Sequence, residues 1–161
     1  MATPTNLPAA FVAGAILTAE QQNNLRGAFR VLQVVNGTTT TSTSATIIGF
    51  VDSTLTATIT PQSNTSKILV IINQSLFVNT ASNECVYRLV RNGTTVQTQV
   101  SPVYSTGGSI LGGVGFAVLD APATTSALVY KTQIAIQLGV GAVTAQQNSN
   151  PGNITLMEIS A

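Results

Sequence analysis

Residues 54–60 constrain the fold of this chain more than any other segment. Threonines at the even positions alternate with Leu55, Ala57 and Ile59 at the odd positions. This period of two is that of a β-strand with one buried face and one polar face, and it does not fit the 3.6-residue period of a helix. We therefore expect the core of the protein to be built from β-strands.

Similar segments follow one another along most of the chain, and turn signals separate them. The strongest signal, Asn92-Gly93, lies between the strand-like segments 85–90 and 94–100 and predicts a hairpin. The other strand-like segments are 46–51, 67–72, 109–119, 127–138 and 153–159. About eight short strands at this spacing predict an all-β fold, an antiparallel β-sandwich or jelly roll.

Residues 68–72 (Ile-Leu-Val-Ile-Ile) are apolar at every position. A strand with one solvated face would alternate, so this strand is expected to be central and buried on both sides. The outer faces of a sandwich are otherwise polar, so the outward row of this strand needs cover. Two arrangements provide it: packing around the threefold axis of a homotrimer, or a helix lying over that face in a monomer.

The first 32 residues have a different pattern. Pro4 and Pro8 remove amide donors and favour extended backbone, which predicts an arm that either folds back on its own domain or docks on another protein. Residues 18–21 (Thr-Ala-Glu-Gln) have the form of a capping box and predict one short helix. This helix either caps the β domain or serves as an anchor or trimer seam. The expected domains are an arm and helix (1–32) and a β-sandwich (33–161).

The chain is poor in charge and contains no histidine. It has six Lys or Arg and five Asp or Glu residues, 7% of the total, and a net charge of +1. Scattered cations do not neutralise a run of phosphates, so no nucleic-acid partner is expected. No apolar stretch approaches the roughly 18 residues of a membrane span, so no membrane insertion is expected. So little charge points to surfaces that are buried in an assembly.

Little catalytic chemistry is available to such a chain. Without histidine there is no Ser-His-Asp triad and no His-ligated metal. Cys85, the single cysteine, has no partner for a disulfide or a zinc site and is expected to be a buried, inert thiol. No acidic loop offers calcium ligands, and no spacing supports a glycosidase carboxylate pair. We expect a protein that is not an enzyme and that uses no cofactor and no metal.

A few charged residues interrupt strand-like segments. Glu158 lies among apolar neighbours in the last segment, and Lys131 and Arg88 lie within two others. A buried carboxylate without a partner would be costly. We therefore expect a structural ion pair between Glu158 and either Lys131 or Arg88, within one chain or across subunits, and a catalytic role for Glu158 is the alternative.

Four segments together resemble a family of small tailed-bacteriophage virion surface proteins. Residues 11–26 (FVAGAILTAEQQNNLR) resemble the attachment segment F-x-A-G-x-x-L-T-A-x-x-x-N found ahead of phage fibre and decoration domains. Residues 65–70, 119–131 and 154–159 resemble the β-sandwich heads of these proteins, which are similar to trimeric tumour-necrosis-factor/C1q-like jelly rolls.

The resemblance implies a non-enzymatic protein of the virion surface, made in the host cytoplasm without a signal peptide. It would be a homotrimeric capsid decoration or head-fibre-like knob, with other copies and other capsid or tail proteins as partners. The apolar residues expected to anchor it are Phe11, Ile16, Leu17, Leu25 and Phe29. The alternative is a tail-fibre receptor-binding module that recognises a host surface glycan through loops 101–109 and 144–152.

Overall fold

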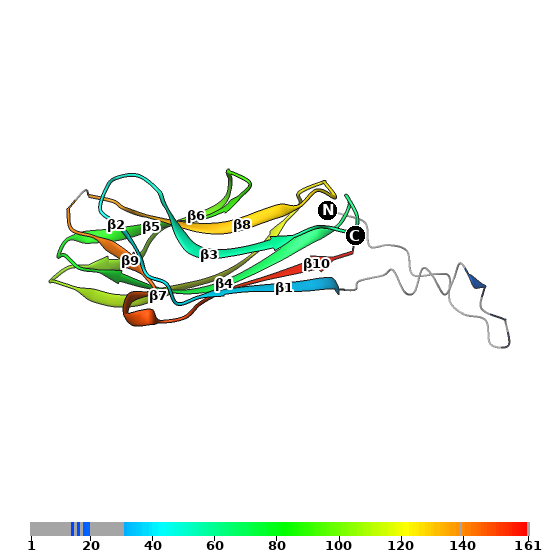
Figure 1. Cartoon of the computed structure of the whole chain (residues 1–161), viewed down its shortest axis with the longest axis horizontal. Coiled ribbons are helices and arrows are strands. Elements are labelled where there is room, and N and C mark those ends of the chain that lie inside the picture. Colours follow the sequence, from blue (N-terminus) through cyan, green and yellow to red (C-terminus); the bar gives the residue numbers. More distant parts are fainter. Residues whose placement is uncertain (1–13, 15, 17, 20–30, 139, 161) are drawn as a thin grey trace.

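Two antiparallel sheets pack face to face in the computed structural model of the chain (Figure 1). The model describes residues 14, 16, 18, 19, 31–138 and 140–160. Sheet A has the order β1-β10-β4-β9-β2, with β7 on the other side of β4, and sheet B has the order β3-β8-β5-β6. The elements are β1 (Val31–Thr39), β2 (Thr43–Ala45), β3 (Val51–Ile59), β4 (Lys67–Val78), β5 (Asn83–Arg91), β6 (Thr94–Ser105), β7 (Ile110–Asp120), β8 (Leu128–Ile136), β9 (Val143–Ala145), η1 (Gln147–Ser149) and β10 (Gly152–Ile159).

The connections have jelly-roll character. The chain crosses from one sheet to the other between β2 and β3, β3 and β4, β4 and β5, β6 and β7, β7 and β8, and β8 and β9. Only β5 and β6 are neighbours in one sheet joined by a tight turn, and Asn92 and Gly93 supply the positive φ angles (46° and 87°) of this turn. The predicted antiparallel β-sandwich or jelly roll is therefore confirmed.

The division of the chain into an arm with a helix and a β-sandwich stays a prediction. Most of residues 1–30 lie outside the described part of the chain. The first strand of the sandwich begins at Val31, two residues before the expected boundary. No helix in the described part of the chain is long and apolar enough to cross a membrane.

The core lies between the two sheets and follows the alternation seen in the sequence. Leu55, Ala57 and Ile59 of β3 are buried, whereas the threonines between them are exposed. From sheet A, residues such as Ile68 and Leu156 are fully buried against them. Each fully buried aliphatic side chain contributes about 1.5–3 kcal/mol relative to an exposed one, so these inner faces supply most of the driving force for folding.

A buried polar cluster, named here the Gln74 cluster, joins the two sheets inside this core. The Gln74 side-chain oxygen on β4 accepts hydrogen bonds from Tyr87 Oη (2.5 Å) on β5 and from Thr132 Oγ1 (2.8 Å) on β8. The Gln74 amide nitrogen donates to Ser53 Oγ on β3 at 3.2 Å. Because every side-chain polar atom of these four residues has a partner, the cluster holds the sheets in one register without an unsatisfied buried group.

Two expectations about strands need correction. β4 is central, with β10 and β7 on its two sides, but its outward residues are not buried within the chain, and Ile71 is 39% exposed. Residues 46–51 were expected to form a strand of their own, but residues 46–50 form a loop and Val51 is the first residue of β3. Ile47 and Ile48 in this loop are 60% and 72% exposed, because the loop lies outside sheet B, where no second layer of the chain covers it.

Candidate functional site

The outer face of sheet A carries an apolar row that crosses four strands. Val34 of β1 is paired with Met157 of β10, Met157 with Leu69 of β4, and Leu69 with Leu119 of β7. The next row along the strands places Ile71 beside Ala117. These six side chains form the sheet A patch: Val34, Leu69, Ile71, Ala117, Leu119 and Met157.

The patch is open to solvent in the single chain. Val34 is 56% exposed, Leu119 is 52% exposed and Ile71 is 39% exposed. Contiguous exposed apolar surface of this kind marks a protein-binding site far more often than scattered apolar residues do. The patch is therefore the first candidate for a functional surface.

The rest of this outer face is small and uncharged. Gly113 and Gly115 of β7 lie opposite Ser75 and Asn73 of β4, so the backbone is accessible there. Of the described residues that point outward from β1, β10, β4 and β7, only Lys67 is charged, and it is the first residue of β4. A partner can approach this face closely and need not remove water from a charged group.

Glu158 closes the end of the sandwich at which β1 begins. Its side chain points inward and is fully buried. The carboxylate accepts hydrogen bonds from Gln33 Nε2 (2.6 Å) and from the backbone N–H groups of Gln62 (2.8 Å) and Ser63 (3.4 Å). Burial pushes the pKa of this carboxyl upward, but the hydrogen bonds outweigh it and hold the pKa below its usual value of 4.5. The carboxylate thus ties β10 to β1 and to the turn before β4.

The expected ion pair of Glu158 with Lys131 or Arg88 is not formed within the chain. Glu158 points into the sandwich from sheet A, whereas Lys131 and Arg88 lie on the outer face of sheet B. Lys131 instead pairs with Asp52, with 2.5 Å between Nζ and Oδ2. Finding this partner from the sequence would have required the register of β3 against β8, which brings Asp52 and Lys131 to the same side of sheet B.

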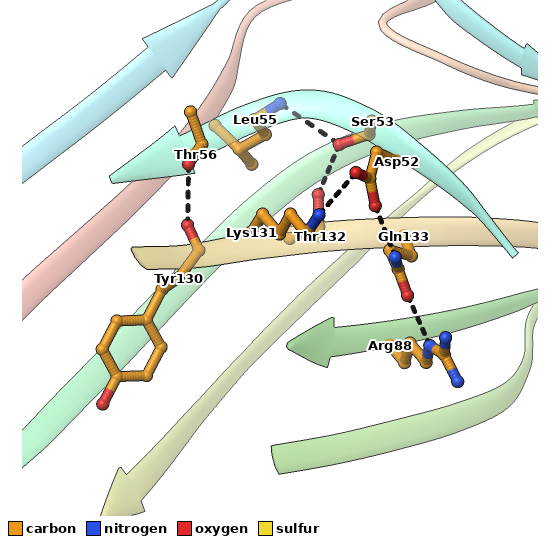
Figure 2. Close-up of polar contacts among 9 residues, drawn as sticks. All are labelled: Asp52, Ser53, Leu55, Thr56, Arg88, Tyr130, Lys131, Thr132 and Gln133. Atoms are coloured by element: carbon orange, nitrogen blue, oxygen red, sulfur yellow. Dashed lines mark hydrogen bonds and ion pairs between the residues drawn. The ribbon is translucent and has the colours of Figure 1, made fainter. Parts of the chain in front are cut away.

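The outer face of sheet B thus carries a charged ladder, which Figure 2 shows along three strands. Asp52 accepts hydrogen bonds from Lys131 and from the Gln133 amide, and Gln133 Oε1 accepts one from Arg88 Nε at 2.6 Å. The hydrogen bond from Lys131, followed by that from Gln133, lowers the pKa of Asp52. The Arg88 guanidinium lies 3.7 Å from the centre of the Phe50 ring. We call Asp52, Lys131, Gln133 and Arg88 the charged ladder.

A second ion pair lies near the β7–β8 turn. Asp120 binds Arg91 and also accepts a hydrogen bond from Tyr130 Oη at 2.6 Å. Burial, assisted by this hydrogen bond, raises the pKa of Tyr130 above its usual range. The arrangement links β7 of sheet A with β5 and β8 of sheet B, so its role is structural.

The described residues offer little chemistry beyond binding. Cys85 is buried as expected, and burial raises the pKa of its thiol to about 12. Within the described ranges, no group of three or more His, Cys, Asp or Glu side chains is placed to hold a metal ion. The candidate sites that the described residues form are therefore the two outer surfaces of the sandwich.

The residues predicted to bind partners are only partly within the described chain. Ile16 is described and is 93% exposed, whereas Phe11, Leu17, Leu25 and Phe29 lie outside the described residues. Of the two loops proposed for glycan binding, residues 101–105 belong to β6 and residues 144–145 to β9. The remaining parts are the turn before β7 and the segment around η1.

The chain is similar to known proteins in its fold. No protein-family model and no curated protein matches the chain. Its fold is similar to the infectious bursal disease virus VP2 subviral particle, with 16% identity and a TM-score of 0.46 over 98% of this chain and 42% of the other. Structures of the Gx strain (17%, TM-score 0.35, 81% and 39% covered) and the Gt strain (19%, 0.31, 80% and 38%) of that virus are also similar. The chain spans about two-fifths of the length of these solved chains, and similarity at this level assigns neither a family nor a function.

Proposed function

We propose that this protein is a non-enzymatic structural subunit of a virus particle. Specifically, it is a homotrimeric capsid decoration or head-fibre-like knob of a tailed bacteriophage, held on the virion surface by residues 1–32. The observation that carries this proposal is the sheet A patch, an exposed row of apolar side chains on a face where Lys67 is the single charged residue among the described outward positions.

The sheet A patch is the surface through which the copies associate. Association costs an estimated 4–15 kcal/mol of lost translational and rotational freedom, so the interface has to bury substantial apolar area. Val34, Leu69, Leu119 and Met157 form one continuous row for this purpose. Burial of this row around a threefold axis agrees with the resemblance of the sequence to trimeric jelly-roll heads, and each copy contributes the same surface.

The arm provides the attachment to the particle. Its apolar residues, with the described Ile16 almost fully exposed, need a partner surface. Deletion of residues 2–17 is expected to leave an assembled domain that no longer decorates particles, as measured by co-sedimentation with undecorated particles. Replacement of the same residues by a Gly/Ser linker of equal length is the matched control, because it removes the apolar side chains and keeps the chain length. Full binding by either variant would contradict the anchor assignment.

A tail-fibre receptor-binding module is the second candidate, and one observation favours it. Tyr104 is 48% exposed on β6 and pairs with Glu84, which accepts a hydrogen bond from Ser101. An exposed aromatic ring beside hydrogen-bonding groups can stack on a sugar. Saturable binding on a glycan array that Tyr104→Ala abolishes would support this candidate, and its absence would favour decoration.

A further inference from the structure

A pocket of about 230 Å³ opens on the outer face of sheet B, beside the first residues of β3. This end of the sandwich is the one far from the start of β1. Its floor is made by Val86 of β5 and Ala135 of β8, which are cross-strand neighbours. The loop before β3 forms one wall with Ile48, Gly49 and Phe50. Pockets that bury a whole small-molecule ligand measure roughly 300–1,000 Å³, so this one fits one or two apolar side chains of a peptide.

Exposed apolar side chains surround this pocket. Ile48 is 72% exposed and Phe50 is 36% exposed, and Val100, the cross-strand neighbour of Val86, is 62% exposed. This surface lies on the opposite side of the sandwich from the sheet A patch. It therefore needs a partner other than the one that covers sheet A.

A cation lies at the rim of the pocket. Arg88 follows Val86 by two residues on the same face of β5, and its guanidinium stacks on Phe50, which lines the pocket. Arg88 uses its Nε to bind Gln133, and no described group accepts a hydrogen bond from its two terminal amino nitrogens. A guanidinium with two available donors beside an apolar pocket suits a segment that carries apolar side chains and a carboxylate.

The chain itself contains such a segment outside the sandwich. Four of its five acidic residues are described, and each accepts a hydrogen bond within the chain: Asp52, Glu84, Asp120 and Glu158. The fifth is Glu20, which follows the apolar residues of segment 11–17. Ile16 in that segment is 93% exposed in the single chain. Apolar character and charge thus match between residues 11–20 and the pocket.

We propose that the pocket receives residues 11–20 of a second copy of the chain, with the Ile16 side chain in the pocket and Glu20 facing Arg88. This inference rests on the proposed function, in which several copies assemble and the arm docks on a partner. It names a neighbouring copy as the partner of residues 11–20 and leaves the contact with the particle itself to the rest of residues 1–32. The arm then links one subunit to the next on the particle surface.

Distance favours a neighbouring copy over the same chain. Residues 20–31 span at most about 40 Å when fully extended. Val31 begins β1 in sheet A, next to Ile159, whereas the pocket lies on the outside of sheet B. The nine residues of β3 that separate the two ends measure about 30 Å, and the sheets lie about 10 Å apart. A path from Val31 around the edge of the sandwich to the chain's own pocket therefore takes the whole extended length of residues 20–31.

Disulfide trapping with the full-length chain tests the proposal. The native Cys85 is buried, and the pKa of its thiol is raised to about 12, so engineered cysteines react without interference. Ile16→Cys and Ile48→Cys are purified as separate variants. They are then mixed under conditions in which the copies assemble, and the mixture is oxidised. We expect a covalent dimer that contains one copy of each variant. Ile16→Cys mixed with Thr58→Cys, an exposed position on the outer face of sheet B at the other end of β3, is the matched control and is expected to give at least tenfold less product.

Charge variants test the assigned contact. Arg88→Gln or Glu20→Gln is expected to lower the initial rate of the 16–48 cross-link about two- to fivefold, the range for an exposed ion pair, and the two together are expected to have no further effect. Lys67→Gln is the control and should leave the rate unchanged.

Several outcomes would overturn the inference. It fails if assembled protein gives no 16–48 product, if the 16–58 product forms equally well, or if only a double Ile16→Cys, Ile48→Cys chain forms the link within itself. The proposed function has a separate readout. If deletion of residues 2–17 abolishes decoration but no 16–48 product forms, the proposed function is retained and this inference is rejected.

Discussion

The outer faces of the two sheets differ although their inner faces share one core. Sheet B presents the charged ladder and the exposed threonines of β3 on its outer face. Figure 2 shows the polar contacts of Asp52, Lys131 and Thr56 on these strands. Sheet A presents the sheet A patch and glycines, and Lys67 is the one charged residue among its described outward positions. One sheet is therefore suited to face water along most of its surface, and the other is suited to face protein.

The difference has its origin in two strands, β3 and β4. In β3 every outward position between Thr54 and Thr58 is a threonine, which hydrogen-bonds to water and still favours extended backbone. In β4 the outward positions include Leu69 and Ile71, so the strand is apolar on both faces. A single jelly roll covers only one of these faces. The breakdown of alternation in this central strand therefore marks the apolar outer face that we propose as the association surface.

The largest effect is expected from a charge placed in the sheet A patch. Leu69→Lys puts an ammonium in the middle of the row between Met157 and Leu119. An unpaired charge buried at an interface costs about 3–5 kcal/mol, which lowers the association constant by a factor of roughly 100 to several thousand. The variant should remain folded by circular dichroism and should sediment as a monomer.

The same change on sheet B is the matched control for Leu69→Lys. Thr58→Lys adds an ammonium to an exposed outward position of β3, and assembly should persist. Equal loss of assembly in both variants would erase the distinction between the two faces.

A smaller effect is expected from the Gln74 cluster, which holds the two sheets together. Tyr87→Phe removes the hydroxyl that donates to Gln74 Oε1 in a fully buried site. Loss of this hydrogen bond should reduce the free energy of unfolding by about 1–3 kcal/mol in urea titrations. Tyr104→Phe, at a 48% exposed position of β6, should change it by less than about 0.5 kcal/mol. If both tyrosines behaved alike, the cluster would not join the sheets.

The buried carboxylate of sheet A predicts a dependence of stability on pH. The pKa of Glu158 is lower in the folded chain than its usual 4.5, so the ionised form stabilises the fold above that value. This stabilisation is lost as the pH falls through the folded-state pKa. The melting temperature of the wild type should therefore decline as the pH falls below the usual pKa of 4.5, and that of Glu158→Gln should decline less. The contribution at neutral pH should be on the order of 1 kcal/mol, and parallel pH curves would rule it out.

The smallest effect is expected on sheet B. Asp52→Asn breaks the ion pair with Lys131, in which the Asp52 side chain is 51% exposed. Exposed pairs contribute about 0.2–1 kcal/mol and are screened by salt. The loss of stability should shrink when the melt is repeated in 1 M NaCl, while assembly stays unchanged. If the loss of stability were the same in 1 M NaCl, the charged ladder would stabilise the fold by something other than the ion pair.

Local patterns predicted much of this fold, because alternation and turn chemistry act over a few residues. The β3 alternation and the Asn92-Gly93 hairpin were both confirmed, and Lys67 begins the central strand as expected. Residues 46–50 were assigned wrongly because Ile47 and Ile48 fit a strand by composition. Only tertiary structure places them in a loop outside sheet B.

The partners of the charged residues could not be predicted from local sequence patterns. Glu158 is satisfied by Gln33 and by backbone amides of the turn at Gln62, which lie far from it in the sequence. Asp52 and Lys131 meet only because β3 and β8 pair in one register. The sequence identifies which strand charges need partners, and the pairing of distant strands decides which partners they find.

Sedimentation of the purified full-length chain tests the central claim most directly. The sheet A patch predicts a particle of three times the 16.6 kDa chain mass. Its dissociation should be insensitive to salt between 0.05 and 1 M NaCl, because the interface buries almost no charge. A species of 16.6 kDa at every concentration would contradict the account, and a stable dimer would retain the association surface but reject threefold assembly.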